Sequence, residues 1–192
     1  NTFFSSVFVD EPTGTLPNFN PRCVYELNSI YISDEKVSKK LQDLQISSSP
    51  GPDRIHPRVL REARKTISKP LSILFNSSIT KGKIPKEWKK AEVCAIFKKG
   101  AKNSPNNYRP VSLTSVACKL LEKLVRDNIM DHLTKHDLLS NKQFGFIQGR
   151  STVLQLLHVL DEWTEAMDQG LPIEAVYMDF QKAFDSVPHR RL

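Results

Sequence analysis

One short apolar run does most to limit the folds open to this chain. Ile173–Phe180 reads IEAVYMDF, a nearly continuous stretch of apolar and β-favouring residues. Gly170 and Pro172 come directly before it and end the helical pattern of the preceding residues. A strand of this composition is expected in the middle of a sheet, where both of its faces are covered. The sequence therefore predicts a sheet with helices packed on it.

Helical spacing of apolar residues marks most of the remaining chain. The predicted helices cover residues 34–46, 57–66, 69–81, 114–136 and 151–169. Ser33 is a suitable N-cap for the first helix, because Asp34 and Glu35 then fall in its first turn. Between the first two helices, Pro50–Gly51 predicts a type II turn in which Gly51 has a positive φ.

A second strand region is predicted between the helices. Residues 91–97 (AEVCAIF) indicate a buried strand, polar residues 98–107 a loop, and residues 108–113 a returning strand. Pro110 cannot donate a ladder hydrogen bond, so the returning strand is expected at a sheet edge or bulged there. The fold class is therefore α+β, with long helices packed on a small, incomplete antiparallel sheet.

The composition favours a soluble globular protein that binds an anion. The chain has 192 residues, of which 39% are hydrophobic and 26% charged, and it has neither a membrane-length apolar run nor a signal pattern. We therefore expect it to act inside the cell, with no membrane partner. The net charge is +7, and lysines crowd one stretch: Lys81, Lys83, Lys86, Lys89, Lys90, Lys98, Lys99 and Lys102. This stretch suits phosphate contacts, although a solvated lysine surface is the alternative.

The cysteines indicate neither disulfides nor a structural metal. Cys23, Cys94 and Cys118 are far apart, with no CxxC pair and no histidine at zinc spacing. Cys94 and Cys118 fall within apolar patterns, so both are predicted to be buried free thiols.

Asp179 stands near the end of the predicted central strand. A carboxylate in that position can bind a hard divalent cation such as Mg²⁺, which needs few protein ligands when phosphates supply the others. The alternative is that Asp179 caps the turn that follows it. Taken by itself, a strand-end aspartate favours the second interpretation.

The string DFQKAFDSVPH at residues 179–189 resembles the first palm motif of reverse transcriptases from non-LTR retrotransposons. The resemblance implies that Asp179 binds the catalytic Mg²⁺ or Mn²⁺ and that Phe180 offers its backbone carbonyl. It implies that Phe184 is an aromatic gate that excludes a 2′-hydroxyl, with a core phenylalanine as the alternative. Asp185 also matches the motif and is assigned a structural role.

Two upstream segments resemble the fingers of the same family. NNYRPVSLTS (106–115) resembles its second fingers motif, and AEVCAIFKKG (91–100) resembles the strand before it. The resemblance implies that Lys98 and Arg109 contact the incoming triphosphate, and Arg can bind its oxygens in bidentate fashion. Lys99 remains an equal alternative to Lys98.

Two further motifs fall outside the fingers hairpin. QFGFIQGRSTVLQLL (143–157) resembles the motif between fingers and palm, in which Gly149 allows a close bend and Arg150 contacts the template backbone or positions its surroundings. SSSPGPDRIHPRVLRE (47–62) resembles the N-terminal extension motif, which usually has glycine where this chain has Arg54. That departure indicates an altered template-binding turn or a decaying element copy.

The ordered motifs imply the fingers and upper palm of a right-hand polymerase, over residues 33–192, after a lead-in over 1–32. The implied activity is RNA-directed DNA synthesis, with an RNA template, a DNA primer and deoxynucleoside triphosphates as partners. No Tyr-x-Asp-Asp string is present, so this chain is expected to be inactive by itself. The alternatives are a degenerate or domesticated remnant that only binds RNA, and a group II intron polymerase.

Overall fold

The computed structural model describes residues 2–6, 25–180, 183 and 187. These residues belong to two compact units, one containing residues 2–6 and 25–132 and the other containing residues 133–180, 183 and 187. A short helix, α1 (Thr2–Ser5), begins the first unit. The described residues combine helices with one two-stranded antiparallel sheet, so the predicted α+β class is confirmed.

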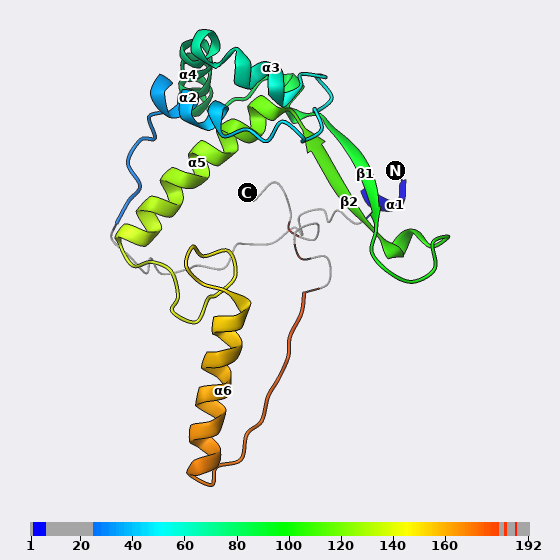
Figure 1. Cartoon of the computed structure of the whole chain (residues 1–192), viewed down its shortest axis with the longest axis vertical. Helices are drawn as coiled ribbons and strands as arrows, with labels where there is room; N and C mark the ends of the chain where they lie inside the picture. Colours follow the sequence, from blue (N-terminus) through cyan, green and yellow to red (C-terminus); the bar gives the residue numbers. More distant parts are fainter. Residues whose placement is uncertain (1, 7–24, 181–182, 184–186, 188–192) are drawn as a thin grey trace, which may run out of the picture. The chain divides into compact units, whose positions relative to one another are not determined.

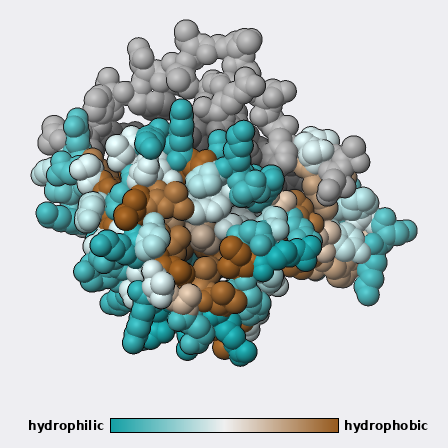
Figure 2. Space-filling model, turned by 90° about the horizontal axis from the view of Figure 1, so that it is seen from above, coloured by the Kyte–Doolittle hydropathy of each residue, from teal (hydrophilic) through white to brown (hydrophobic). Residues whose placement is uncertain are grey.

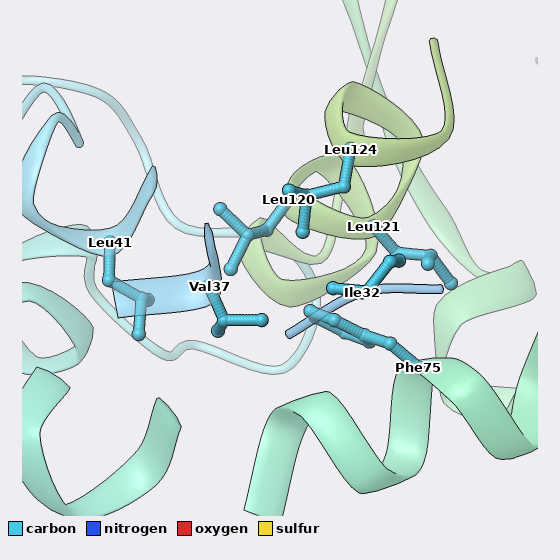
Figure 3. Packing of buried hydrophobic residues seen from close by; sticks show 7 residues of the cluster. All are labelled: Ile32, Val37, Leu41, Phe75, Leu120, Leu121 and Leu124. Carbon is cyan, nitrogen blue, oxygen red and sulfur yellow. The ribbon is translucent and has the colours of Figure 1, made fainter. Parts of the chain in front are cut away.

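Four helices build the core of the first unit: α2 (Asp34–Gln42), α3 (Pro57–Glu62), α4 (Arg64–Lys81) and α5 (Val116–Lys135) (Figure 1). The predicted cap of α2 is confirmed, because the Ser33 hydroxyl accepts a hydrogen bond from the Lys36 N–H at 3.3 Å. Figure 3 shows apolar side chains of α2, α4 and α5 meeting around Ile32. The buried cluster is Ile32, Val37, Leu41, Phe75, Leu120, Leu121 and Leu124.

The start of α4 differs from the prediction. The helix begins at Arg64 rather than at residue 69, so Pro70 lies inside it. A proline there removes a hydrogen bond to the preceding turn and crowds the carbonyl four residues earlier, but the fully buried side chain of Phe75 holds the helix against the core. The predicted end is confirmed, since Gly82 adopts a left-handed φ of 59°.

The predicted type II turn at Pro50–Gly51 is wrong. Gly51 is absent from the residues with positive φ, whereas Arg54 has a φ of 58° and donates its N–H to the Gly51 carbonyl at 2.9 Å. Glycine is required at position 51 for a different reason, because backbone atoms of Thr114 and Ser115 occupy the place of a Cβ. A Cβ on it would lie 2.5 Å from the carbonyl oxygen of Thr114.

The hairpin consists of β1 (Ala91–Phe97) and β2 (Tyr108–Thr114), which pair from Ala91↔Thr114 to Phe97↔Tyr108. It follows the 3₁₀ turn η1 (Lys86–Lys89), and a second 3₁₀ turn, η2 (Pro105–Asn107), lies in its loop. In Figure 1 the hairpin extends away from α2, α3, α4 and α5. Pro110 pairs with Ala95 without a bulge, and the predicted edge position is confirmed because both strands are edges.

The predicted burial of β1 is wrong, because every residue of this strand is exposed. In the part of the chain described, the sheet has two strands, and apolar side chains such as Ile96 therefore stay accessible. Cys94 is exposed for the same reason, which corrects its predicted burial. The predicted burial of Cys118 is confirmed, and Cys23 lies outside the described residues.

Hydrophobic surface is also exposed on the helices of the first unit. Figure 2 shows it between hydrophilic side chains on the face viewed from above. Among the described residues, the accessible apolar side chains of α3 and α4 include Val59, Ile73 and Leu74. No helix in the described ranges is long and apolar enough to cross a bilayer.

The second unit contains α6 (Thr152–Asp168), and its predicted end at Gly170 is confirmed. The Ser151 hydroxyl accepts from the Leu154 N–H at 3.2 Å, and Gly170, with φ 67°, donates its N–H to the Met167 carbonyl at 2.9 Å. The helix buries none of its residues. Its predicted apolar side, with Leu157 and Met167, is more than half exposed.

The predicted central strand at residues 173–180 is wrong. These residues form no ladder within the described chain, and Tyr177 and Met178 are 85% and 88% exposed. An apolar composition shows only that a segment is suited to the inside of a sheet. The strand itself forms when a neighbouring strand pairs with its backbone. Between residues 25 and 180, β1 and β2 pair only with each other.

Candidate nucleic-acid interface

The hairpin has a cationic face and an aromatic face. Arg109 pairs with Ile96, and the Lys98 N–H donates to the Asn107 carbonyl at 2.8 Å, which continues the same register by one residue. Because side chains alternate along a strand, the side chains of Lys98 and Arg109 project from the same face of the hairpin. Neither cation has an ion-pair partner among the described side chains.

The opposite face of the hairpin carries two aromatic rings. Phe97 and Tyr108 are a directly opposed pair, with ring centroids 5.5 Å apart in a T-shaped arrangement. The Lys102 ammonium lies 5.8 Å from the Phe97 ring centroid, a cation–π contact. The Tyr108 hydroxyl donates to the Lys102 carbonyl at 2.8 Å. An aromatic pair with a cation beside it is a surface on which bases can stack.

Asn107 orders the loop between the strands, a role that was not predicted from the sequence. Its side-chain amide donates to the Ala101 carbonyl at 2.8 Å. Gly100, with φ 90°, lies so close that a Cβ there would be 2.7 Å from the Asn107 Nδ2. The position of an asparagine directly before the returning strand could have indicated this role, since asparagine side chains readily form hydrogen bonds with nearby backbone groups. The loop therefore holds its lysines on an ordered backbone.

The crowded lysines are mostly available to an anion. Lys90 is paired with Glu87 at 2.9 Å, which leaves its charge partly neutralised. Lys86, Lys89, Lys98, Lys99 and Lys102 are all exposed. An exposed group of cations raises the local concentration of a polyanion and gives it phosphate contacts.

Arg150 lies in a loop of the second unit and binds backbone carbonyls. Its Nη1 donates to the carbonyls of Ser140 at 2.8 Å and Gln143 at 2.5 Å. Its guanidinium also lies 5.8 Å from the Phe144 ring centroid. These contacts favour the positioning role over the template contact, because backbone carbonyls of the loop already occupy the Nη1 donors.

Two other predicted nucleic-acid contacts lie in turns. Gly149 has a φ of 81° and open space around it, so its conformation rather than a close approach requires glycine. Arg54 is exposed with a φ of 58°, a conformation that favours glycine. That backbone explains why a glycine is expected at this position.

Asp179 and Phe180 belong to the second unit and are exposed, with Phe180 at 83%. The carboxylate of Asp179 and the adjacent carbonyl are hard oxygen donors of the kind that Mg²⁺ selects. Within the described ranges, no group of three acidic, histidine or cysteine side chains is arranged to hold a metal. These two donors therefore suit part of a metal site. Phe184 and Asp185 lie outside the described residues.

Comparison with known proteins places these motifs in context. Residues 96–192 match the family described as reverse transcriptase (RNA-dependent DNA polymerase). The chain is 34% identical over 156 residues to a probable RNA-directed DNA polymerase from transposon BS of Drosophila melanogaster. It is 30% identical over 156 residues to the RNA-directed DNA polymerase from mobile element jockey of the same species. Each match covers 81% of this chain and 17% of the relative. A Pol polyprotein from type-1 retrotransposable element R1 of Bradysia coprophila is 26% identical, over 80% of this chain and 15% of the relative. The chain thus spans about a sixth of the length of these relatives.

Proposed function

This chain belongs to the reverse transcriptase family, and we propose that it forms the fingers and upper palm of an RNA-directed DNA polymerase of a non-LTR retrotransposon. In that reaction the 3′-hydroxyl oxygen of a DNA primer attacks the α-phosphorus of a deoxynucleoside triphosphate. A phosphodiester bond forms, pyrophosphate leaves and the hydroxyl proton passes to solvent. An RNA template selects each nucleotide, and the enzyme acts inside the cell.

The observation that carries this proposal is the shared face of Lys98 and Arg109. Their positions in the register put two cations together at the loop end of an exposed hairpin. A triphosphate carries several negative charges, and charge-assisted hydrogen bonds to it contribute about 1.5–3 kcal/mol each. The register also favours Lys98 over Lys99, because the Lys98 N–H still bonds to the Asn107 carbonyl and the alternation of side chains puts Lys98 on the face of Arg109. We therefore assign the binding of the triphosphate to Lys98 and Arg109.

Asp179 would hold the divalent ion with the carbonyl of Phe180, because both supply hard oxygens. The ion supplies charge stabilisation at the reacting phosphate when it is bound. Phe184 is proposed as the gate against a ribose 2′-hydroxyl, and Arg54 as a template contact. Gly149 and Arg150 shape the loop before α6. The sequence contains no Tyr-x-Asp-Asp string, so we propose that this chain by itself does not polymerise.

Binding of a fluorescent deoxynucleoside triphosphate, followed by anisotropy with Mg²⁺ present, tests the proposal. Arg109→Gln and Lys98→Gln should each weaken binding about tenfold, because each removes a charge-assisted bond. Lys99→Gln is the matched control, with the same charge change one residue along, and should have a smaller effect. Equal effects at positions 98 and 99 would refute the assignment of Lys98.

A primer-extension assay tests the lack of activity. The chain, given an RNA template, a DNA primer and Mg²⁺, is expected to add no nucleotide. Synthesis that Asp179→Ala abolishes would show that these residues already contain a complete catalytic site. Synthesis that survives Asp179→Ala would overturn the role of Asp179 itself.

A further inference from the structure

A groove of about 430 Å³ lies between α2, the loop that follows it and α5. All of the residues that line it belong to the first unit. Its lining includes apolar Leu44, Pro57 and Leu120, of which Pro57 and Leu120 are buried. The hydroxyls of Ser48 and Ser49, both exposed residues, add hydrogen-bonding groups. The groove is distinct from the hairpin, which extends away from these helices (Figure 1).

The charged groups of the groove are mainly cations. Lys119, Lys123 and Arg126 stand at positions i, i+4 and i+7 of α5, so they form one stripe along the helix. Lys40 of α2 also lines the groove. Like charges one helical turn apart destabilise a helix by about 0.2–0.5 kcal/mol per pair. Such a stripe is costly to the free protein and becomes favourable when an anion lies along it.

The partners of these cations differ. Asp127 binds both Lys40, at 2.5 Å, and Arg126, at 2.9 Å, so one carboxylate is shared between two cations. Burial raises the pKa of Asp127, but the hydrogen bonds from Lys40 and Arg126 outweigh it and hold that pKa below its usual range. In the described part of the chain, neither Lys119 nor Lys123 has an ion-pair partner. Their two ammonium groups are therefore the ones available to a ligand.

We propose that this groove binds the phosphodiester backbone of RNA, with Lys119 and Lys123 contacting phosphates. The two lysines are about 6 Å apart along the helix axis, a spacing comparable with that of successive phosphates on one strand. Lys40 and Arg126, joined by Asp127, extend the positive surface, and the serine hydroxyls can donate to phosphate or ribose oxygens. The proposal rests on the proposed function, which supplies RNA as the ligand. Asp43, which also lines the groove, opposes an anion and weakens binding.

The test measures binding of the whole chain to a fluorescent single-stranded RNA by anisotropy over a range of salt concentrations. The double variant Lys119→Gln/Lys123→Gln should bind about tenfold more weakly. Its slope of log affinity against log salt should be shallower by about 1.4, because each phosphate contact on a single strand contributes about 0.7. Asp43→Asn should bind more tightly than the parent, since it removes the opposing charge.

The matched control is Lys65→Gln/Lys69→Gln. These exposed lysines have the same i, i+4 spacing on α4 and the same charge change, but they do not line the groove. Thermal unfolding should show no loss of stability in the groove variant, because a like-charge repulsion has been removed. A groove variant that unfolds earlier than the control would contradict this account of the stripe.

The possible outcomes separate this inference from the proposed function. Equal weakening by the groove and control variants would overturn the groove alone. Weakening by Lys98→Gln/Arg109→Gln with no effect of the groove variant would do the same and leave the polymerase assignment intact. A parent chain that does not bind RNA at low salt would count against both. Polyglutamate that displaces the RNA as well as unlabelled RNA does would assign the groove to an acidic polypeptide and refute the proposal.

Discussion

The side-chain amide of Asn76 holds the backbone of Ile32 from both sides. Its Oδ1 accepts the Ile32 N–H at 3.0 Å, and its Nδ2 donates to the Ile32 carbonyl at 2.8 Å. The Ser72 hydroxyl donates to the same carbonyl at 2.7 Å. Ile32 is fully buried, so water cannot replace these bonds easily. The amide thus fixes the segment before α2 onto α4.

Asn76→Ala should lower the free energy of unfolding of the first unit by about 2 kcal/mol, because it leaves the Ile32 N–H buried without a partner. Asn103→Ala, at an exposed loop residue, is the control and should change stability by less than about 0.5 kcal/mol. Urea unfolding in a Trp163→Phe background makes the measurement, since Trp88 packs on Phe75 and reports on this core. Equal stability of both variants would show that the amide contributes little.

Gly51→Ala should destabilise the first unit by about 1–3 kcal/mol. The added Cβ would meet the carbonyl oxygen of Thr114 at 2.5 Å and the nitrogen of Ser115 at 2.7 Å, both rigid backbone atoms. Gly145→Ala is the control, because Gly145 has no atom within 4 Å of the added Cβ and no positive φ. Thermal unfolding compares the two. A harmless Gly51→Ala would mean that the loop and the end of β2 are not held this closely.

Arg54→Gly should stabilise the chain by about 1 kcal/mol, since it relieves a left-handed backbone that costs a side-chain-bearing residue about that much. Arg54→Ala removes the same charge but keeps the Cβ, so it should give no stabilisation. The pair also tests the proposed template contact by anisotropy with labelled RNA. If Arg54 binds RNA, both variants lose affinity equally while only the glycine variant gains stability.

The two described thiols should differ in reactivity. Burial, followed by the nearby carboxylate of Glu122, raises the pKa of Cys118 to about 11. Against an ordinary thiol, that pKa leaves roughly a hundredfold less thiolate at pH 8. In a Cys23→Ser background, iodoacetamide should therefore modify exposed Cys94 first, and mass spectrometry of timed samples gives both rates. Faster modification of Cys118 would contradict its burial.

The same pKa has a consequence for stability. Because the folded-state pKa of Cys118 lies above its unfolded value, its contribution is complete below about pH 9 and is lost as the pH rises toward about 11. Cys118→Ala should remove that loss. Unfolding midpoints in urea, measured from pH 8 to pH 11 for both proteins, provide the comparison, and parallel curves would show that another group is responsible.

The sequence by itself determined the cap of α2, the ends of α4 and α6 and the course of the hairpin. It did not determine the end of α2, which lies at Gln42 rather than at residue 46, or the start of α4. The predicted cap at Ser33 and the terminating Gly82 and Gly170 agree with the structure, because each interaction joins residues within one or two turns. The edge position of Pro110 was equally predictable, since the missing N–H is a property of the residue itself.

Only the tertiary structure decided which surfaces are covered. The apolar run at residues 173–180 and the strand β1 have the composition of buried strands, yet both are exposed where the structure describes them. Gly51 was expected to supply a positive φ, but it is required by the approach of Thr114, which lies far along the chain. Local hydrogen bonds join residues that are close in the sequence, so the sequence is enough to predict them. The burial of a side chain and the close approach of two backbones depend on which distant segment of the chain packs there. A local pattern of residues does not contain that information.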